Sequence, residues 1–162
     1  MFIKAQGLDD PLVRPPLLAE FQKRGVASDR IELRGLSPLV NAMNEFSQHV
    51  DVVLDTIPYP GGTTSCHLLW SGVPVVTLAG KLPIHRLGAT VLATIGLSDL
   101  IAKDADDFVR IATELAKNES RRDELRTSLR TRMKSSPLMD APRFARSLES
   151  LYRDMWRNWC EG

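Results

Sequence analysis

Two short apolar runs, Val-Val-Leu at 52–54 and Val-Val-Thr-Leu at 75–78, constrain the fold more than any other feature of the sequence. Neither run alternates between apolar and polar residues, which is typical of strands buried on both faces of a parallel sheet. Parallel neighbours need a crossover connection, and a segment of helical period separates the two runs. The chain is therefore predicted to be an α/β protein with these two strands at its core.

Similar segments extend this pattern in both directions. Glycines at positions 25, 72 and 96 mark the ends of three candidate helices, because glycine most easily adopts the left-handed conformation that follows a helix. The prediction is a Rossmann-like, mostly parallel sheet of about five strands with flanking helices. The further strands are expected at 2–5, 30–34 and 100–102, and the helices at 17–24, 39–48, 63–70 and 86–95.

The last third of the chain carries no strand signal after residue 102. Asp104 is expected to cap a helix, with Asp107 near the positive end of that helix. A second helix is expected at 121–134, with its arginines paired to interleaved acidic residues on the surface. The final helix, 141–159, carries an apolar stripe at helical spacing that we expect to be buried. The stripe consists of Phe144, Leu148, Leu151, Tyr152, Met155, Trp156 and Trp159.

Length and composition limit the number of domains and the kinds of partner that the chain can have. The 162 residues fit one domain, with 1–102 as an α/β core and 103–162 as a helical segment that packs on it. Lys and Arg number 21 and Asp and Glu 20, so no strong field attracts nucleic acid or anionic lipid. Cys66 and Cys160 match neither a disulfide framework nor a metal-ligand spacing, and no apolar run reaches the ~18 residues of a membrane span. We expect a cytoplasmic protein with no resident cofactor or metal.

The densest candidate site is the segment 55–67, which leads from the carboxyl end of a strand into a helix. Ligands of open parallel sheets bind at this edge, and the start of a helix offers free amides and a positive dipole end to phosphate. Gly61 and Gly62 would let the main chain approach an anion, and Thr63 and Thr64 would add hydroxyl donors. The spacing alone supports two interpretations equally: a phosphate-binding turn, and a purely structural turn in which Thr63 caps the helix.

Two neighbouring side chains invite a catalytic interpretation. Asp55, at the strand end, could act as a general base, but we favour a role as acceptor for backbone N–H groups of the turn at 56–62. Cys66 lacks the basic neighbour that a reactive thiolate needs. No catalytic residue is assigned in this chain.

The residues from His49 to Cys66 and from Leu69 to Gly80 resemble the bacterial SPINDLY-like O-linked N-acetylglucosamine transferases. The resemblance continues through 85–89, 96–102, 136–140 and 148–156, so it spans nearly the whole chain. It implies a two-lobed GT-B catalytic region, usually behind tetratricopeptide repeats, that transfers a sugar from a UDP-sugar to Ser or Thr hydroxyls of proteins. Only the C-terminal, donor-binding lobe is represented. Its first strand and helix, which carry a lysine for the leaving UDP, are absent, so the fragment alone is expected to be inactive.

The resemblance also assigns residues of the donor site. Thr63 and Thr64 match two threonines that hold the diphosphate at a helix start, and Gly61 matches the glycine before them. Gly62 replaces a histidine of the animal enzyme. His67 stands where that enzyme has a ribose-contacting aspartate, and neutral imidazole accepts a hydrogen bond less strongly than a carboxylate. The nucleobase contact, expected within 35–48, is not assigned.

Arg86 matches a family arginine that could neutralise phosphate, although it could equally tie its loop to a carboxylate. Two alternative functions stay open: a non-catalytic nucleotide-binding or protein-interaction module, and a GT-B enzyme of the sugar-nucleotide epimerase type. The expected partners are a UDP-sugar and, in the complete enzyme, a protein acceptor, with neither nucleic acid nor membrane. A homodimer is also expected, because a second copy could cover the edge that the absent strand leaves between 2–5 and 52–55 and the apolar stripe of the final helix. The alternative is that the two flanking strands close up within one chain.

Overall fold

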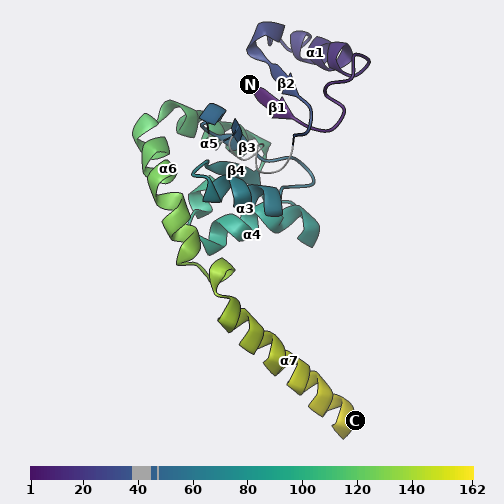
Figure 1. Ribbon diagram of the computed structural model, residues 1–162, viewed down its shortest axis with the longest axis vertical. Helices are drawn as coiled ribbons and strands as arrows, with labels where there is room; N and C mark the ends of the chain where they lie inside the picture. The colour runs from purple at the N-terminus through teal and green to yellow at the C-terminus, as the bar shows by residue number, and fades with distance from the viewer. Residues whose placement is uncertain (38–44, 47) are drawn as a thin grey trace. The chain divides into compact units, whose positions relative to one another are not determined.

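The computed structural model describes residues 1–37, 45–46 and 48–162 (Figure 1). The chain divides into two compact units, Met1–Val50 and Asp51–Gly162. Each unit is described by itself, and the single domain expected from the sequence stays a prediction. Most of the helix expected at 39–48 lies outside the described residues.

The first unit is a small βαβ arrangement. Strand β1 (Phe2–Lys4) pairs in parallel with β2 (Glu32–Arg34). The connection between them contains helix α1 (Arg14–Gln22) and the 3-10 turn η1 (Ser28–Arg30). The core of the first unit is formed by the buried residues Leu8, Ile31 and Leu33. The partly buried residues that pack against this core are Ile3, Leu17, Leu18, Phe21 and Val26.

The second unit contains a three-stranded parallel sheet in the order β3-β4-β5. The strands are β3 (Val53–Leu54), β4 (Val75–Leu78) and β5 (Ile101–Ala102). The crossovers carry α3 (Thr63–Trp70), η2 (Pro83–Arg86), α4 (Leu87–Thr94) and η3 (Ser98–Leu100). All five expected strands are present and every pairing is parallel, which confirms the predicted α/β class.

The two apolar runs differ in burial. β4 is a central strand, and Val75, Val76 and Thr77 are at most 1% exposed, as expected. The expectation that 52–54 is equally buried is wrong, because Leu54 is half-exposed. In the described sheet β3 lies at an edge, so one side of it has no neighbouring strand to cover it. The described strands form two separate sheets, β1-β2 in the first unit and β3-β4-β5 in the second.

The helices after the sheet begin at well-defined caps. The Asp104 carboxylate accepts a hydrogen bond from the Asp107 amide at 2.8 Å, and the Asp107 carboxylate accepts one from the Lys103 amide at 3.2 Å. This reciprocal pair starts α5 (Ala105–Lys117), as predicted. The Arg110 side chain and the Lys103 N–H together hold the pKa of Asp107 below its ordinary value.

Helix α6 (Glu119–Lys134) packs against α3 and α5, and α5 packs on β4 and β5. The arginines of α6 form the expected ion pairs, for example Arg121 with Asp99 at 2.9 Å and Arg132 with Glu124 at 3.2 Å.

The turn η4 (Pro137–Met139) and helix α7 (Ala141–Glu161) end the chain. None of the residues of α7 is buried in the chain as described, so the expected burial of the apolar stripe is not found within a single copy. The stripe is left exposed because η4 is the main element against which α7 packs. No helix in the described ranges is long and apolar enough to cross a membrane.

We predict that Gly72→Ala destabilises the second unit more than Gly96→Ala. Both glycines have left-handed backbones, with φ of 85° and 73°, where alanine is strained by about 1–2 kcal/mol. At Gly72 an added Cβ would also lie 2.8 Å from the Arg126 carbonyl oxygen, whereas Gly96 has nothing within 4 Å. Urea unfolding followed by circular dichroism should show a loss of at least about 2 kcal/mol for Gly72→Ala and about 1 kcal/mol for Gly96→Ala. Equal losses would contradict the packing argument.

Candidate functional site

The carboxylate of Asp55 organises the segment between β3 and α3. One of its oxygens, Oδ1, accepts hydrogen bonds from the backbone amides of Thr56 at 3.0 Å and Gly61 at 2.7 Å. The other, Oδ2, accepts from the hydroxyl of Thr77 on β4 at 2.8 Å. Asp55 is only 9% exposed. The interpretation of Asp55 as an acceptor for the turn is thereby confirmed, and both of its oxygens are occupied.

Two glycines allow the chain to pass close to this carboxylate. A Cβ at Gly61 would lie 2.4 Å from the Ser65 hydroxyl oxygen and 3.4 Å from Asp55 Oδ1. A Cβ at Gly88, in α4, would lie 2.4 Å from Asp55 Oδ2 and 2.7 Å from the Thr77 hydroxyl oxygen. Any other residue at Gly88 would displace the hydrogen bond between Thr77 and Asp55, and any other residue at Gly61 would displace the Ser65 hydroxyl. Sequence reasoning missed the role of Gly88, although a glycine inside a helical segment signals such a close approach.

The start of α3 has free hydrogen-bond donors. Gly62 is the N-cap residue, and no side chain caps the helix. Thr63 is the first helical residue, so the alternative in which its hydroxyl caps α3 is not found. The Cys66 amide donates to the Gly62 carbonyl at 3.1 Å. In the described part of the chain, no partner is found for the amides of the first three helical residues, 63–65.

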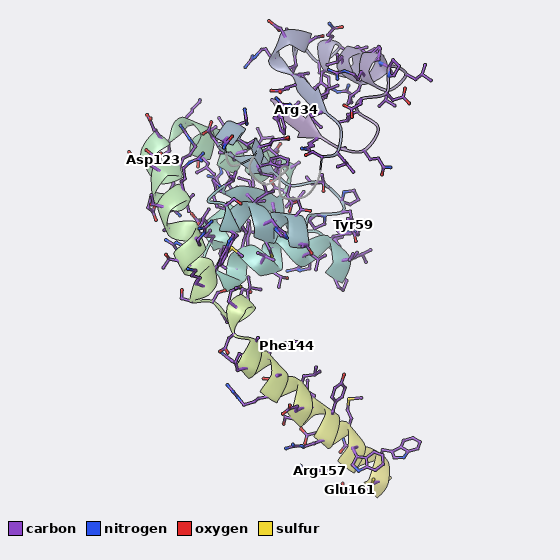
Figure 2. All side chains as sticks on the ribbon, in the orientation of Figure 1. Arg34, Tyr59, Asp123, Phe144, Arg157 and Glu161 are labelled. Atoms are coloured by element: carbon purple, nitrogen blue, oxygen red, sulfur yellow. The ribbon has the colours of Figure 1, made fainter. Side chains whose placement is uncertain are left out.

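The turn before α3 is held by its own backbone and presents apolar side chains. The Thr56 hydroxyl donates to the Tyr59 carbonyl, and the peptide bond between Ile57 and Pro58 is cis. Ile57 and Tyr59 are more than half-exposed, and Tyr59 can be located in Figure 2.

The remaining candidate residues come from α3 and from the loop after β4. His67 is half-buried, one turn after Thr63 on the same face of α3. Arg86 is exposed at the end of η2 and donates to the Gly80 carbonyl at 3.4 Å, which is a long hydrogen bond. Leu87, the next residue, lies beside Gly62, since a Cβ built there would be 3.7 Å from its Cδ1. The structure therefore brings the two loops together at the carboxyl edge of the sheet.

Cys66 does not contribute a nucleophile. Burial raises the pKa of its thiol, so the neutral form is favoured. Within the described ranges, no group of three or more His, Cys, Asp or Glu side chains is arranged to hold a metal ion.

We predict that Asp55→Ala and Asp51→Ala, at the two ends of the β3 segment, have very different costs. Removal of Asp55 leaves one buried and two part-buried donors without their acceptor, so the free energy of unfolding should fall by about 3 kcal/mol. The Asp51 carboxylate lies 3.3 Å from Arg126 and is 75% exposed, so its loss should cost less than about 1 kcal/mol. Urea unfolding of both variants measures the difference. Similar values would show that Asp55 does not organise the turn.

Comparison with known proteins identifies relatives along most of the chain. The family model described as Glycosyl transferase family 41 matches residues 12–148. A probable UDP-N-acetylglucosamine–peptide N-acetylglucosaminyltransferase SPINDLY of Eustoma exaltatum is 40% identical over 150 residues, which are 93% of this chain and 16% of that protein. The protein of the same name from Arabidopsis thaliana is 38% identical over the same shares. A Caenorhabditis elegans UDP-N-acetylglucosamine–peptide N-acetylglucosaminyltransferase is 30% identical over 71% of this chain and 10% of its own length.

A solved structure supports the same relationship to N-acetylglucosaminyltransferases. A mutant of the Thermobaculum terrenum O-GlcNAc transferase superposes with a TM-score of 0.91 at 36% identity, over 99% of this chain and 31% of its own. The chain thus spans about a sixth of the plant relatives and under a third of the solved one. The resemblance noted in the sequence is confirmed: the chain belongs to glycosyl transferase family 41.

Proposed function

We propose that this chain binds the UDP-sugar donor of a transferase that attaches N-acetylglucosamine to Ser or Thr hydroxyls of proteins. The observation that carries the proposal is the uncapped start of α3, which Asp55 holds at the carboxyl edge of the sheet. Family membership supports the reaction class, and the activity named for the relatives supports the sugar and the protein acceptor.

The diphosphate is proposed to bind at the first turn of α3. The amides at the start of an α-helix point out of its first turn, Thr63 and Thr64 are exposed residues there, and the helix dipole favours an anion. Gly62 faces open space apart from Leu87, so the main chain can approach a phosphate there. The Gly61 amide already donates to Asp55, and the role of Gly61 is therefore to allow the close packing of the turn rather than to donate to the ligand.

His67 and Arg86 are proposed to complete the donor site. His67 follows the threonines by one turn, and its neutral imidazole can accept a hydrogen bond from a ribose hydroxyl. Among the described residues, the Arg86 guanidinium makes only a long hydrogen bond to its own loop, so it can turn to a phosphate at little cost. The UDP-sugar is a co-substrate, and the proposal requires no resident cofactor or metal.

The chain by itself is proposed to bind the donor without turnover. It corresponds to 31% of the solved relative, and no described residue is placed to act as a general base toward an acceptor hydroxyl. The described residues are proposed to hold the donor diphosphate but not to activate an acceptor, so little activity is expected. Membership of a glycosyltransferase family opposes the epimerase alternative.

We predict that UDP shifts the amide resonances of Gly62, Thr63 and Thr64 when isotope-labelled protein is titrated to millimolar ligand. The Gly61 resonance should move less, because its amide is already bonded to Asp55. Uridine is the matched control: it lacks the diphosphate and should leave the first turn of α3 unchanged. If UDP perturbs only amides elsewhere, the site is misplaced.

We predict a graded response at His67. His67→Asp should retain or increase UDP affinity, because a carboxylate accepts a ribose hydroxyl more strongly than imidazole. His67→Leu should weaken binding by about 1–3 kcal/mol, since the ribose hydroxyl loses its acceptor. Titration calorimetry with UDP compares the three proteins. Equal affinities would show that His67 does not contact the nucleotide.

A further inference from the structure

The first turn of α4 lies very close to the sheet, and Gly88 is the residue that permits this. Gly88 is the second residue of α4 and is buried. A Cβ at this position would lie 2.4 Å from Asp55 Oδ2 and 2.7 Å from the Thr77 hydroxyl oxygen, which is too close for a carbon atom. Glycine is a poor helix former, so its presence inside a helix calls for a packing reason. The reason here is that α4 begins in contact with the ends of β3 and β4.

The residue before Gly88 makes a second contact. The Cδ1 atom of Leu87 lies 3.7 Å from the position that a Cβ would take at Gly62, the N-cap residue of α3. This is an ordinary van der Waals distance. The segment 86–88 is therefore held at two points: Gly88 packs on the Asp55 carboxylate, and Leu87 packs on the start of α3.

Arg86 combines a fixed main chain with a mobile charge. It is the N-cap residue of α4, so the packing of Leu87 and Gly88 determines where its main chain lies. Its side chain is exposed, and its guanidinium makes only the 3.4 Å hydrogen bond to the Gly80 carbonyl among the described residues. Ordering a long side chain costs entropy, and a main chain that is already in place limits the remaining cost of bringing its charge to a ligand. The reach of Arg86 toward α3 is thus set by the packing of the two residues that follow it.

We propose that Gly88 and Leu87 are positioning residues of the donor site and that they act through Arg86. The inference rests on the proposed function, because the diphosphate at the first turn of α3 is the group that Arg86 meets. The side chains of Gly88 and Leu87 offer this diphosphate no hydrogen-bond donor. Their effect on binding comes from the place that they give to the guanidinium.

The geometry indicates how large the effect of a substitution is. A Cβ at Gly88 would have to withdraw from Asp55 Oδ2 by about 1 Å to reach an ordinary contact distance of 3.4 Å, and the start of α4 would move with it. Hydrogen bonds from a guanidinium to a phosphate are about 2.7–2.9 Å long and depend on orientation. A displacement of this size therefore weakens the contact that Arg86 makes with the ligand.

A double-mutant cycle between Gly88 and Arg86 tests the proposal. Titration calorimetry on the 162-residue chain gives the dissociation constant of UDP for Gly88→Ala, Arg86→Gln and the double variant. Each single variant should weaken UDP binding about tenfold, and the double variant should be no more than about twofold weaker than Arg86→Gln. Uridine lacks the diphosphate, and its affinity should change less than about twofold. Gly96→Ala, just beyond the other end of α4, has open space for its Cβ and is the control that should leave UDP affinity unchanged.

Leu87 supplies a second cycle that leaves the glycine in place. Leu87→Ala removes the contact with Gly62, and Leu87 is 37% exposed, so the fold should tolerate the change. UDP affinity should fall about threefold to fivefold when Arg86 is present and less than about 1.5-fold in the Arg86→Gln background. Ile84→Ala, 42% exposed in the same loop, is the matched control. Circular dichroism checks the folding of each variant, and the Leu87 cycle decides alone if Gly88→Ala does not fold.

The outcomes distinguish this inference from the proposed function. Equal effects of the Gly88 and Leu87 variants with and without the Arg86 guanidinium would overturn the inference and leave the diphosphate site at α3 in place. An Arg86→Gln variant that binds UDP as well as the unchanged chain would do the same. A chain that binds no UDP, or binds it without shifts of the Thr63 and Thr64 amides, would overturn the proposed function and this inference together.

Discussion

The hydrogen bonds of the Asp55 carboxylate hold together the part of the second unit on which the candidate site depends. They join the end of β3, the turn before α3, the hydroxyl of Thr77 on β4 and, by close packing, the start of α4 at Gly88. A buried carboxylate is costly unless donors surround it, and three donors do so here. Both carboxylate oxygens accept hydrogen bonds from the protein itself, so Asp55 has a structural role rather than the role of a base.

The arginines of α6 serve the fold in a comparable way. Arg122 donates to the carbonyls of Leu115 and Ala116 at the end of α5, and Arg130 donates to the carbonyl of Trp70 at the end of α3. Helix ends carry unpaired carbonyls and partial negative charge, so cations are favourable there. The arginine-rich composition of this segment thus has a structural explanation, and a nucleic-acid surface is not needed to account for it.

The sequence allowed the strands, the parallel class and the helix caps to be predicted, because each depends on local pattern or on neighbours a few residues away. Asp104 with Asp107 and the positive-φ glycines are examples. Burial was harder to predict. Leu54 and the stripe of α7 have the composition of a core, but their exposure depends on which element covers them, and that is decided by partners distant in the chain. The role of Gly88 was also hard to predict, because it depends on a close approach to Asp55, which is distant in the sequence.

In the proposed function the start of α3 faces two anions, and the site would therefore need a cation from another loop. The buried carboxylate of Asp55 lies beneath the helix start, and the proposed diphosphate lies above its first amides. A helix end supplies only about half an elementary positive charge, which is less than either anion requires. The amides at 63–65 provide hydrogen bonds but no net charge. Arg86 lies in the adjacent loop, next to the residue that contacts Gly62, and carries the full positive charge that the helix cannot supply.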